Sequence, residues 1–304
     1  MPLFIALEKG YFKDEGLDVQ ITPFQQGIDQ LPALTNGQLD IGSTGPDPGY
    51  FNAFARGIQM KVTGFYEVVT PANKGLAMLV RKDLVDSGKY QSPKDLKGLN
   101  FGVISPNSSN MVYVKRFLAK DGLTLKDVNL VTLPFPDMLP AITNKRVDVV
   151  EEIQPFILQA ENQSLAKSVA TSGELVPGAP QFMLLYTPDF MTKQPEAARR
   201  FMVAFMRGQR DLWHAFDKGD GDKNVIYQIL SKYTAIKDPK QNEALAATGV
   251  LSGTLPNGEM PLDGVSAFQD FFLESGTQTQ KIDLNTLVDH SWADYAVQQL
   301  GKLQ

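Results

Sequence analysis

One eleven-residue segment of this chain occurs twice in closely similar form. Residues 31–41 read LPALTNGQLDI and residues 139–149 read LPAITNKRVDV, so the copies are displaced by 139 − 31 = 108 positions. Six of the eleven pairs are identical, and three more exchange one aliphatic residue for another. Each copy predicts a helix that ends at an Asn, followed by a tight turn into a buried strand.

The spacing and the flanks of the two copies bear on the architecture. Solenoid repeats have periods of about 20–50 residues, far shorter than this displacement. A Pro-Phe pair precedes each copy, at 23–24 and at 134–135, and FKDEGL at 12–17 corresponds to FLAKDGL at 117–123. This shared order favours two similar α/β lobes that face each other across a cleft. Chance similarity between short helix–turn–strand segments is the alternative.

Composition excludes several classes of protein. At 304 residues the chain exceeds what one hydrophobic core usually serves, so two lobes are expected. The net charge is −5 without a Lys/Arg cluster, which argues against nucleic acid as a partner. Cysteine is absent, which excludes disulfides and thiolate catalysis. No apolar run approaches the roughly 18 residues of a membrane span, and no signal peptide is recognised.

Hydrophobic patterning and turn residues predict the domain organisation. We expect an α/β protein of two similar three-layer lobes, with lobe 1 formed by residues 1–84 and 188–304 and lobe 2 by residues 85–187. The hinge connections are expected near 81–99 and 185–188, and the chain from Pro195 onward reads as mostly helical. A helix opens the chain without a preceding strand, and Val19–Thr22 is predicted to be a short strand.

Four loops are predicted to bind a ligand. In parallel α/β lobes, ligands lie at the carboxyl ends of strands, where helix N-termini direct N–H groups outward. The hydroxyl, amide and backbone donors of these loops suit a carboxylate, sulfonate or similar oxyanion, although the same residue types also serve as ordinary helix caps. The candidate binding residues in the loops are Gln25, Gln26, Gly27, Ser43, Thr44, Gly45, Asn107, Ser108, Ser109 and Gln154.

The register of the repeat adds acidic candidates. Continuing it sets Ser43 and Thr44 of the first copy opposite Glu151 and Glu152 of the second. Consecutive strand residues point to opposite faces, so at most one glutamate faces the cleft, and we select Glu152. Together with Glu67 it would favour a ligand with an ammonium, amidine or other donor group. The alternative is that both glutamates are solvated or paired with the basic residues just before the strand.

Aromatic residues also lie at predicted strand ends, and from these we select Tyr66, Phe135 and Tyr186 as candidates to contact an apolar or ring-bearing ligand. Catalysis finds little support. His214 and His290 are the only histidines, and no metal-binding, P-loop, GxSxG or GxGxxG motif is present. We therefore expect a protein that is not an enzyme and has no metal or cofactor.

Several segments together resemble one protein family. ALEKGYFKDEGLDV at 6–19, LDIG at 39–42, LVRKD at 79–83, DLKG at 95–98 and PEAARRF at 195–201 are similar to nitrate/sulfonate/taurine-type ABC transporter substrate-binding proteins. The resemblance covers nearly the whole chain. It implies a periplasmic-binding-protein type II fold with a hinged cleft, and a ligand site that includes the region of Pro2. This chain departs from the family pattern at Gln154 and at Glu151-Glu152, so the ligand is not carried over.

The resemblance also implies partners and a location. We expect a monomer outside the cytoplasm that delivers a small polar or anionic organic solute, of sulfonate, nitrate or taurine-like class, to an inner-membrane permease and its ATPase. A nitrogen-bearing or aromatic solute is also open. Two other functions remain as alternatives: an enzyme of pyrimidine- or thiamine-type synthesis on the same fold, and a ligand-sensing domain.

Overall fold

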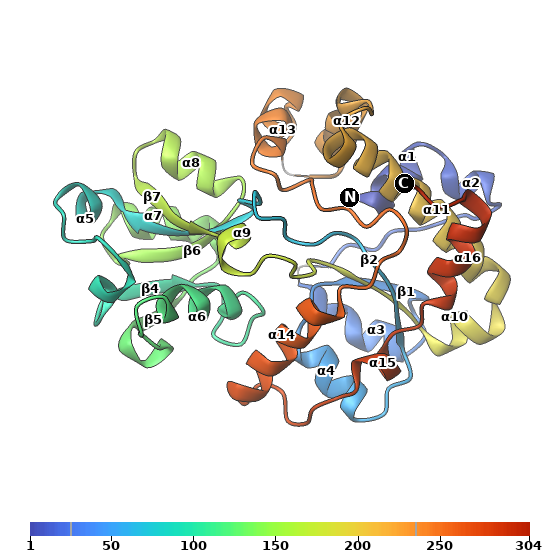
Figure 1. Cartoon of the computed structure of the whole chain (residues 1–304), viewed down its shortest axis with the longest axis horizontal. Coiled ribbons are helices and arrows are strands. Elements are labelled where there is room, and N and C mark those ends of the chain that lie inside the picture. Colours follow the sequence, from blue (N-terminus) through green and yellow to red (C-terminus); the bar gives the residue numbers. More distant parts are fainter. Residues whose placement is uncertain (25, 235) are drawn as a thin grey trace. The chain divides into compact units, whose positions relative to one another are not determined.

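The computed structural model describes residues 1–24, 26–234 and 236–304 (Figure 1). The chain forms two compact units. Unit 1 contains residues 1–68, 178–246 and 251–304, and unit 2 contains residues 69–177 together with the short return segment 247–250. Both units combine helices with a β-sheet, as the sequence predicts.

Unit 1 contains a three-stranded sheet. Its strand order is β1 (Ile41–Thr44), β8 (Met183–Tyr186) and β2 (Lys61–Phe65), and β8 is antiparallel to both neighbours. The helices and 3-10 turns of this unit are α1 (Pro2–Glu8), α2 (Tyr11–Asp14), η1 (Gly27–Gln30), α3 (Leu31–Thr35), α4 (Pro48–Ala55), α10 (Pro188–Lys193), α11 (Pro195–Trp213), α12 (Lys223–Tyr233), α13 (Pro239–Ala246), α14 (Leu262–Glu274), α15 (Leu284–Leu287) and α16 (Ser291–Leu300). The predicted helical character after Pro195 is confirmed.

The core of unit 1 forms around α11. This helix contacts both α1 and α16 (Figure 1). Its side chains Phe201 and Phe205 join a buried cluster with Tyr186 and Trp292. Burial of such aromatic side chains stabilises a fold by roughly 1.5–3 kcal/mol each. A single π-helical turn, His214–Lys218, continues α11.

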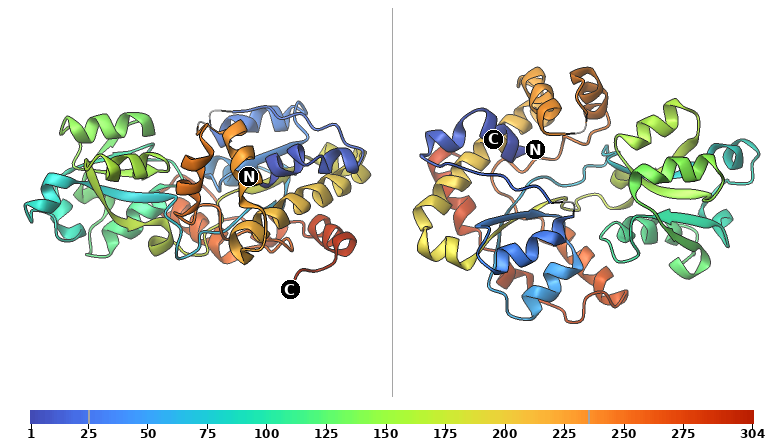
Figure 2. Two further views of the ribbon diagram at one scale, coloured as in Figure 1. Left: turned by 90° about the horizontal axis from the view of Figure 1, so that it is seen from above. Right: turned by 180° about the vertical axis from the view of Figure 1, so that it is seen from behind.

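Unit 2 is built on a five-stranded sheet. Its strand order is β5 (Asn129–Thr132), β4 (Asn100–Val103), β6 (Val149–Ile153), β3 (Leu76–Arg81) and β7 (Ala166–Thr171). Strands β5, β4 and β6 are parallel, and β3 runs antiparallel between β6 and β7. Helices α7 (Phe135–Thr143) and α8 (Phe156–Asn162) cover one face and α6 (Met111–Ala119) the other (Figure 2). The remaining turns are α5 (Lys82–Asp86), η2 (Pro93–Leu96), η3 (Leu125–Asp127) and α9 (Ser172–Leu175).

The unit boundaries differ from the expected ones. The chain leaves unit 1 after residue 68 and returns at residue 178, which is 84 − 68 = 16 and 187 − 177 = 10 residues earlier than expected. Strand pairing explains the shift, because β3 pairs with β6 and β7 in unit 2, whereas β8 pairs with β1 and β2 in unit 1. Residues 81–99, the expected first hinge, therefore lie within unit 2, and residues 185–188 lie within unit 1.

The predicted strand at Val19–Thr22 is also corrected. Residues 17–24 follow α2 without regular secondary structure and lie outside both sheets. Val19 instead packs its side chain against the aromatic cluster of unit 1. The alternating apolar residues of this segment therefore indicate packing against the core. They do not indicate a strand, because no neighbouring strand among the described residues pairs with the segment.

The internal repeat is confirmed at the level of single hydrogen bonds. Helix α3 ends at Asn36 and α7 ends at Asn144, and each leads through a turn into β1 or β6. The bonds 36→32, 37→34 and 38→33 from N–H to carbonyl in the first copy recur as 144→140, 145→142 and 146→141 in the second. In addition, Thr35 Oγ1 donates to the Leu31 carbonyl at 3.0 Å, and Thr143 Oγ1 donates to the Leu139 carbonyl at 2.9 Å.

Candidate functional site

Two adjacent glutamates of β6 are the least expected residues in the core of unit 2. Glu151 and Glu152 both have 0% exposed surface. The register pairs Glu152 with Ala77, on the face of the sheet that α7 and α8 cover. Glu151 lies on the opposite face, which it shares with Val149, and α6 covers that face. The prediction that the two side chains point apart is consistent with this register.

In each of these carboxyl groups only one of the two oxygens has a hydrogen-bond partner. Glu151 Oε1 accepts a hydrogen bond from the Ile104 N–H at 2.8 Å, and Glu152 Oε1 accepts one from the Ile153 N–H at 2.9 Å. The second oxygen of each is buried without a partner. Desolvation raises the pKa of Glu151 to about 7 and that of Glu152 to about 8, and the neighbouring Glu151 charge adds to the shift at Glu152.

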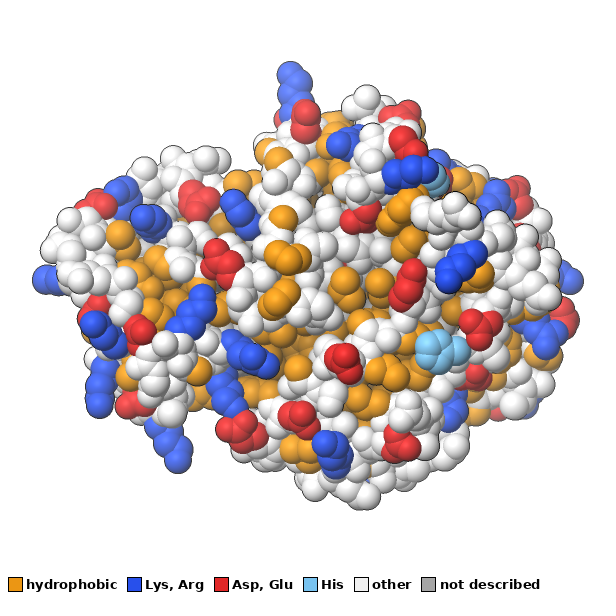
Figure 3. Space-filling view, in the orientation of Figure 1, with side chains coloured by type: hydrophobic (Ala, Val, Ile, Leu, Met, Phe, Trp, Pro, Cys, Tyr) orange, Lys and Arg blue, Asp and Glu red, His pale blue; other side chains and the backbone are white. Residues whose placement is uncertain are grey.

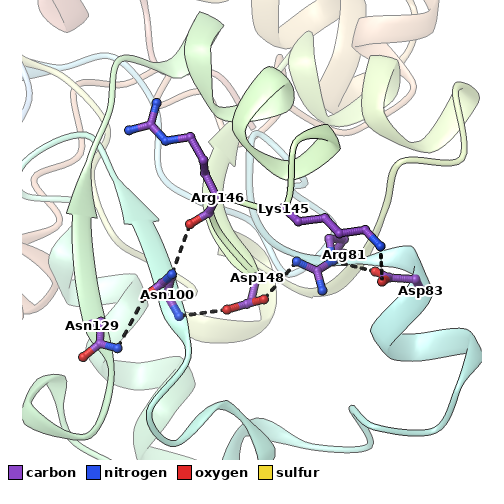
Figure 4. A network of polar contacts seen from close by, with 7 residues as sticks. All are labelled: Arg81, Asp83, Asn100, Asn129, Lys145, Arg146 and Asp148. Atoms are coloured by element: carbon purple, nitrogen blue, oxygen red, sulfur yellow. Dashed lines mark hydrogen bonds and ion pairs between the residues drawn. The ribbon is translucent and has the colours of Figure 1, made fainter.

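Both glutamates are buried and their carboxyl groups accept only from backbone N–H groups, so the alternative of solvated or ion-paired glutamates is wrong. Lys145 Nζ lies 3.7 Å from Asp83, and the Arg146 carbonyl accepts a hydrogen bond from Asn100 (Figure 4). Asp148 forms the centre of the same network, with Arg81 Nη1 at 3.0 Å and the Asn100 N–H at 3.0 Å. This network fixes the start of β6, whereas Glu151 and Glu152 lie further along the strand.

The other predicted residues of unit 2 lie in the loops after β4 and β6 and at the start of α7. Ser108 Oγ donates to the Ser105 carbonyl at 2.9 Å, so this hydroxyl closes a local turn, while Asn107 is exposed and Ser109 is half-buried. The Gln154 side chain donates to the Lys74 carbonyl and accepts from the Leu158 N–H. Phe135 opens α7, and its ring packs against the core between helix and sheet.

In unit 1, Ser43 and Thr44 end β1 beside the turn η1. Gln30 holds this strand end, because its side chain donates to the Ser43 carbonyl at 2.7 Å and accepts from the Ser43 N–H at 3.1 Å. The Gly27 carbonyl accepts from the Tyr50 hydroxyl at 2.9 Å. A Cβ on Gly27 would lie 2.1 Å from Thr44 Oγ1, so only glycine permits this close approach.

The remaining loop residues of unit 1 surround this contact. Gly45 follows β1, where a Cβ would lie 3.2 Å from the Gln181 carbonyl oxygen. Gln26 is exposed and its N–H donates to Asp29. The prediction for Gln25 lies outside the described residues. The structure therefore brings Gly27, Ser43 and Thr44 together at one end of the small sheet.

A second polar group of unit 1 lies just beyond β2. The Tyr66 hydroxyl, Glu67 Oε2 and Thr254 Oγ1 are all buried without a hydrogen-bond partner. Glu67 and Thr254 are partners in an isolated antiparallel bridge, so their side chains lie side by side on one face. Burial raises the pKa of Glu67, the buried α-amino group of Met1 opposes that shift, and the Asp217 carboxylate adds to it.

Two residues near this group have no signal in the sequence. Thr254 is 254 − 67 = 187 positions from its bridge partner, and only the fold brings it there. Phe182 is one of two large hydrophobic side chains that are exposed among the described residues, at 43%, and its ring centroid lies 5.8 Å from that of Tyr66. An exposed aromatic before a strand resembles a loop residue in sequence, so patterning alone does not select it.

Two further predicted residues of unit 1 are buried, Tyr186 in the same cluster as Tyr66 and Pro2 in the first helix. Tyr186 has no exposed surface, and its hydroxyl donates to the Ala198 carbonyl at 3.1 Å within the aromatic core. Pro2 is buried in the first turn of α1, where its carbonyl oxygen would lie 2.3 Å from a Cβ on Gly208. Both residues are explained by packing around α11.

Neither a metal centre nor a membrane span is evident in the part of the chain that the structure describes. No group of three or more His, Cys, Asp or Glu side chains is arranged to hold a metal ion among these residues. None of their helices combines the length and apolar character that crossing a bilayer needs. Acidic and basic side chains are interspersed on the face in Figure 3.

Comparison with known proteins gives a consistent result. A model of the family described as NMT1/THI5 like matches residues 1–215. A candidate binding protein of Brucella abortus is 24% identical over 294 residues, which cover 96% of this chain and 86% of that protein. The bicarbonate-binding protein CmpA of Synechococcus elongatus is 23% identical over 69% of this chain and 50% of its own length.

Solved structures show the same fold. The periplasmic nitrate-binding protein NrtA of Synechocystis has a TM-score of 0.77 at 18% identity, over 99% of this chain and 86% of its own. The desulfurization enzyme DSZB has a TM-score of 0.68 at 14% identity, over 98% of this chain and 96% of its own. The predicted periplasmic-binding-protein fold is confirmed, and the same fold also occurs in an enzyme.

Proposed function

Since the chain belongs to the NMT1/THI5-like family, we propose that it is the solute-binding component of an ABC importer, which captures a small polar organic solute. The single observation that carries this proposal is the set of buried, unpartnered polar atoms in both units. Glu67 in unit 1 and Glu151 and Glu152 in unit 2 each have one such oxygen. A buried polar atom without a partner costs about 1–3 kcal/mol, and a bound ligand that supplied the missing hydrogen bond would remove that cost.

The identity of the solute does not follow from the relatives. CmpA is named for bicarbonate and NrtA for nitrate, both small oxyanions. This chain has three buried carboxyl groups, which in their ionised form would repel such anions. We propose that Ser43, Thr44 and the loop at 107–109 contact the polar end of an organic solute.

Binding without turnover is favoured over catalysis. DSZB shares the fold and is an enzyme, so the fold alone leaves both functions open. This chain contains no cysteine, and its two histidines both lie in unit 1, in the π-helical turn after α11 and at the start of α16. His214 pairs with Asp220 at 2.6 Å, and the buried glutamates of β6 belong to unit 2. We propose a receptor that is not an enzyme.

The partners follow from this role. We propose that the protein acts as a monomer outside the cytoplasm, where it delivers its solute to a membrane permease that an ATPase energises. The naming of NrtA as periplasmic supports this location. The permease would contact exposed charged side chains of the kind that Figure 3 displays.

A thermal-shift screen tests the proposal. The panel contains sulfonates, nitrate, bicarbonate, aromatic carboxylates, pyrimidines and small amines. A solute at 100 times its Kd should stabilise the protein by about 2.7 kcal/mol, which raises the midpoint of unfolding visibly. A cooperative melt that no small solute shifts would contradict the proposal.

The hit from that screen should then be titrated calorimetrically into Glu152→Gln, with Glu161→Gln as the matched control. Glu161 lies on α8 of the same unit and is exposed. Weaker binding to the first variant alone would support a contact with Glu152. Equal affinity for both would remove Glu152 from the site and leave the binding role intact.

A further inference from the structure

The unpartnered group of unit 1 combines three chemically different side chains. The exposed fractions of Tyr66, Glu67 and Thr254 are 4%, 8% and 6%, so each is more than nine-tenths buried. A phenol, a carboxyl and an aliphatic hydroxyl without partners form a set that has more acceptor than donor capacity. Hydrogen bonds from N–H groups of a bound molecule would satisfy it.

The π-helical turn after α11 positions this group. Asp217 lies in that turn, and its carboxylate accepts from the Gly253 N–H at 2.6 Å and from the Thr254 N–H at 3.2 Å. The Val68 N–H donates to the Gly253 carbonyl, which fixes the same segment beside the end of β2. Thr254 is therefore held next to Glu67 by backbone bonds that do not involve its own hydroxyl.

The electrostatic environment disfavours an oxyanion here. The side chains that the structure describes as buried include no Lys or Arg, and the basic group that acts on Glu67 is the buried α-amino group of Met1, whose own pKa burial lowers. Arg210, a partly buried base of α11, donates to the carbonyl oxygens of Pro256 and Leu300. Both Glu67 and the nearby Asp217 are acidic, and a second anion would repel them.

Phe182 gives Tyr66 an exposed aromatic neighbour. Its ring packs on Tyr66, and the Tyr66 N–H donates to the Phe182 carbonyl, so the two residues keep a fixed spacing. A flat ring can stack on an exposed aromatic face while its substituent reaches a deeper polar group.

From these contacts we propose that Tyr66, Glu67 and Thr254, with Phe182 as their aromatic cover, form a subsite for a flat organic cation with amidinium-type N–H donors. This subsite rests on the proposed solute-binding function and specifies the class of solute. Glu67 pairs with the cationic nitrogen, the Thr254 hydroxyl accepts a second N–H, and Phe182 stacks on the ring. Asp217 is a positioning residue that acts through the backbone of residues 253–254.

Three probes of one shape test this subsite: benzamidine, benzamide and benzoate, which are cationic, neutral and anionic. Each is titrated at millimolar concentration into the wild-type protein and the Glu67→Gln variant, with thermal shift and calorimetry as readouts. The matched control is Glu243→Gln, at an exposed position of α13. We expect binding in the order benzamidine, benzamide, benzoate, and about a tenfold or greater loss of benzamidine affinity in Glu67→Gln alone.

Phe182→Ala is a second variant whose folding is not in doubt, because the side chain is exposed. It should weaken benzamidine and benzamide by a similar factor, since stacking does not depend on charge. Tighter binding of benzoate than of benzamidine, no binding of any probe, or an unchanged benzamidine affinity in both variants would overturn the subsite. If a solute of the earlier panel still binds, solute capture stands and only this subsite falls; if none does, both proposals fall.

Discussion

The two copies of the repeat have the same backbone and different chemistry. Each runs from a helix through an Asn-capped turn into a strand with matching hydrogen bonds. Past the eleventh residue, however, the first copy continues with Ser43 and Thr44, and the second with Glu151 and Glu152. The comparison teaches that a helix–turn–strand segment places whatever side chains follow it at a strand end, so similar scaffolds can present hydroxyls in one unit and carboxyls in the other.

The copies also differ within the turn. Gly37 adopts a φ of 71° and Lys145 a φ of 57°. Glycine occupies this left-handed conformation freely, whereas an L-residue with a side chain pays roughly 1–2 kcal/mol for it. The second copy keeps the conformation because the network around Asp148 and the cap of α7 hold the turn from both sides.

The largest expected contrast between the copies is in the pH dependence of stability. The pKa values of Glu151 and Glu152 rise to about 7 and about 8 on folding, from an ordinary value of 4.5. The folded state therefore binds these protons more tightly than the unfolded state. The stability that they contribute is complete below about pH 4.5 and is lost as the pH rises toward 7 and 8, by up to about 1.4 kcal/mol per pH unit for each carboxyl.

Urea denaturation of the wild type and of a Glu151→Gln/Glu152→Gln variant at pH 5 and pH 7 measures this contrast. The variant should lose less stability between the two pH values than the wild type does. The corresponding Ser43→Ala/Thr44→Val variant of the first copy should lose as much stability between pH 5 and pH 7 as the wild type does. An equal loss of stability in all three proteins would show that the pKa values of the glutamates do not change on folding.

The next largest effect should come from the buried aliphatic residue that the copies share. Leu34 in α3 and Ile142 in α7 occupy equivalent positions and are 3% and 2% exposed. Truncation of either to Ala should lower the free energy of unfolding by about 2–5 kcal/mol, because it removes buried methyl groups and leaves a cavity. Chemical denaturation of each variant gives the two values. A loss below about 1 kcal/mol at one site would mean that only the other copy anchors its helix.

The smallest effect should come from the turn. Gly37→Ala should lower stability by about 1 kcal/mol, since alanine is strained at this φ. Lys145→Gly should raise it by about 0.5 kcal/mol, because relief of strain exceeds the added entropy of glycine in the unfolded chain. The exposed ion pair of Lys145 with Asp83 contributes little, and Lys145→Ala separates its loss from the backbone effect. A decrease in stability for Lys145→Gly would refute the strain argument.

The local elements of the fold could be predicted from the sequence. The helix–turn–strand repeat, the helix at the start of the chain and the helical region after Pro195 all follow from short-range patterns of apolar residues, Asn, Gly and Pro. The assignment of β3 and β8 to the units did not follow, because a strand's partners depend on ladders with residues far along the chain. The strand prediction for Val19–Thr22 was wrong for the same reason. The residue pattern is that of a strand, but a strand forms only where another strand pairs with it.

The candidate site divides in a similar way. Glu67 was selected from its position just past a predicted strand and Glu152 from the register of the repeat, and the structure adds that both are buried with an unpartnered oxygen. Tyr186 shares the same sequence position relative to its strand, yet its side chain lies in the aromatic core. A strand end and a core position look alike in sequence, since both place an aromatic or polar residue after an apolar run.

The sequence by itself determined the duplicated helix–turn–strand scaffold, the absence of thiol chemistry and the residues that could follow each strand, because these depend on neighbours within a few positions of each other. Tertiary structure alone decided which of those residues became buried without a partner, and it alone brought Thr254 and Phe182 to Tyr66 and Glu67. The physical reason is that burial and desolvation are set by side chains distant in the sequence, which only the completed packing brings into contact.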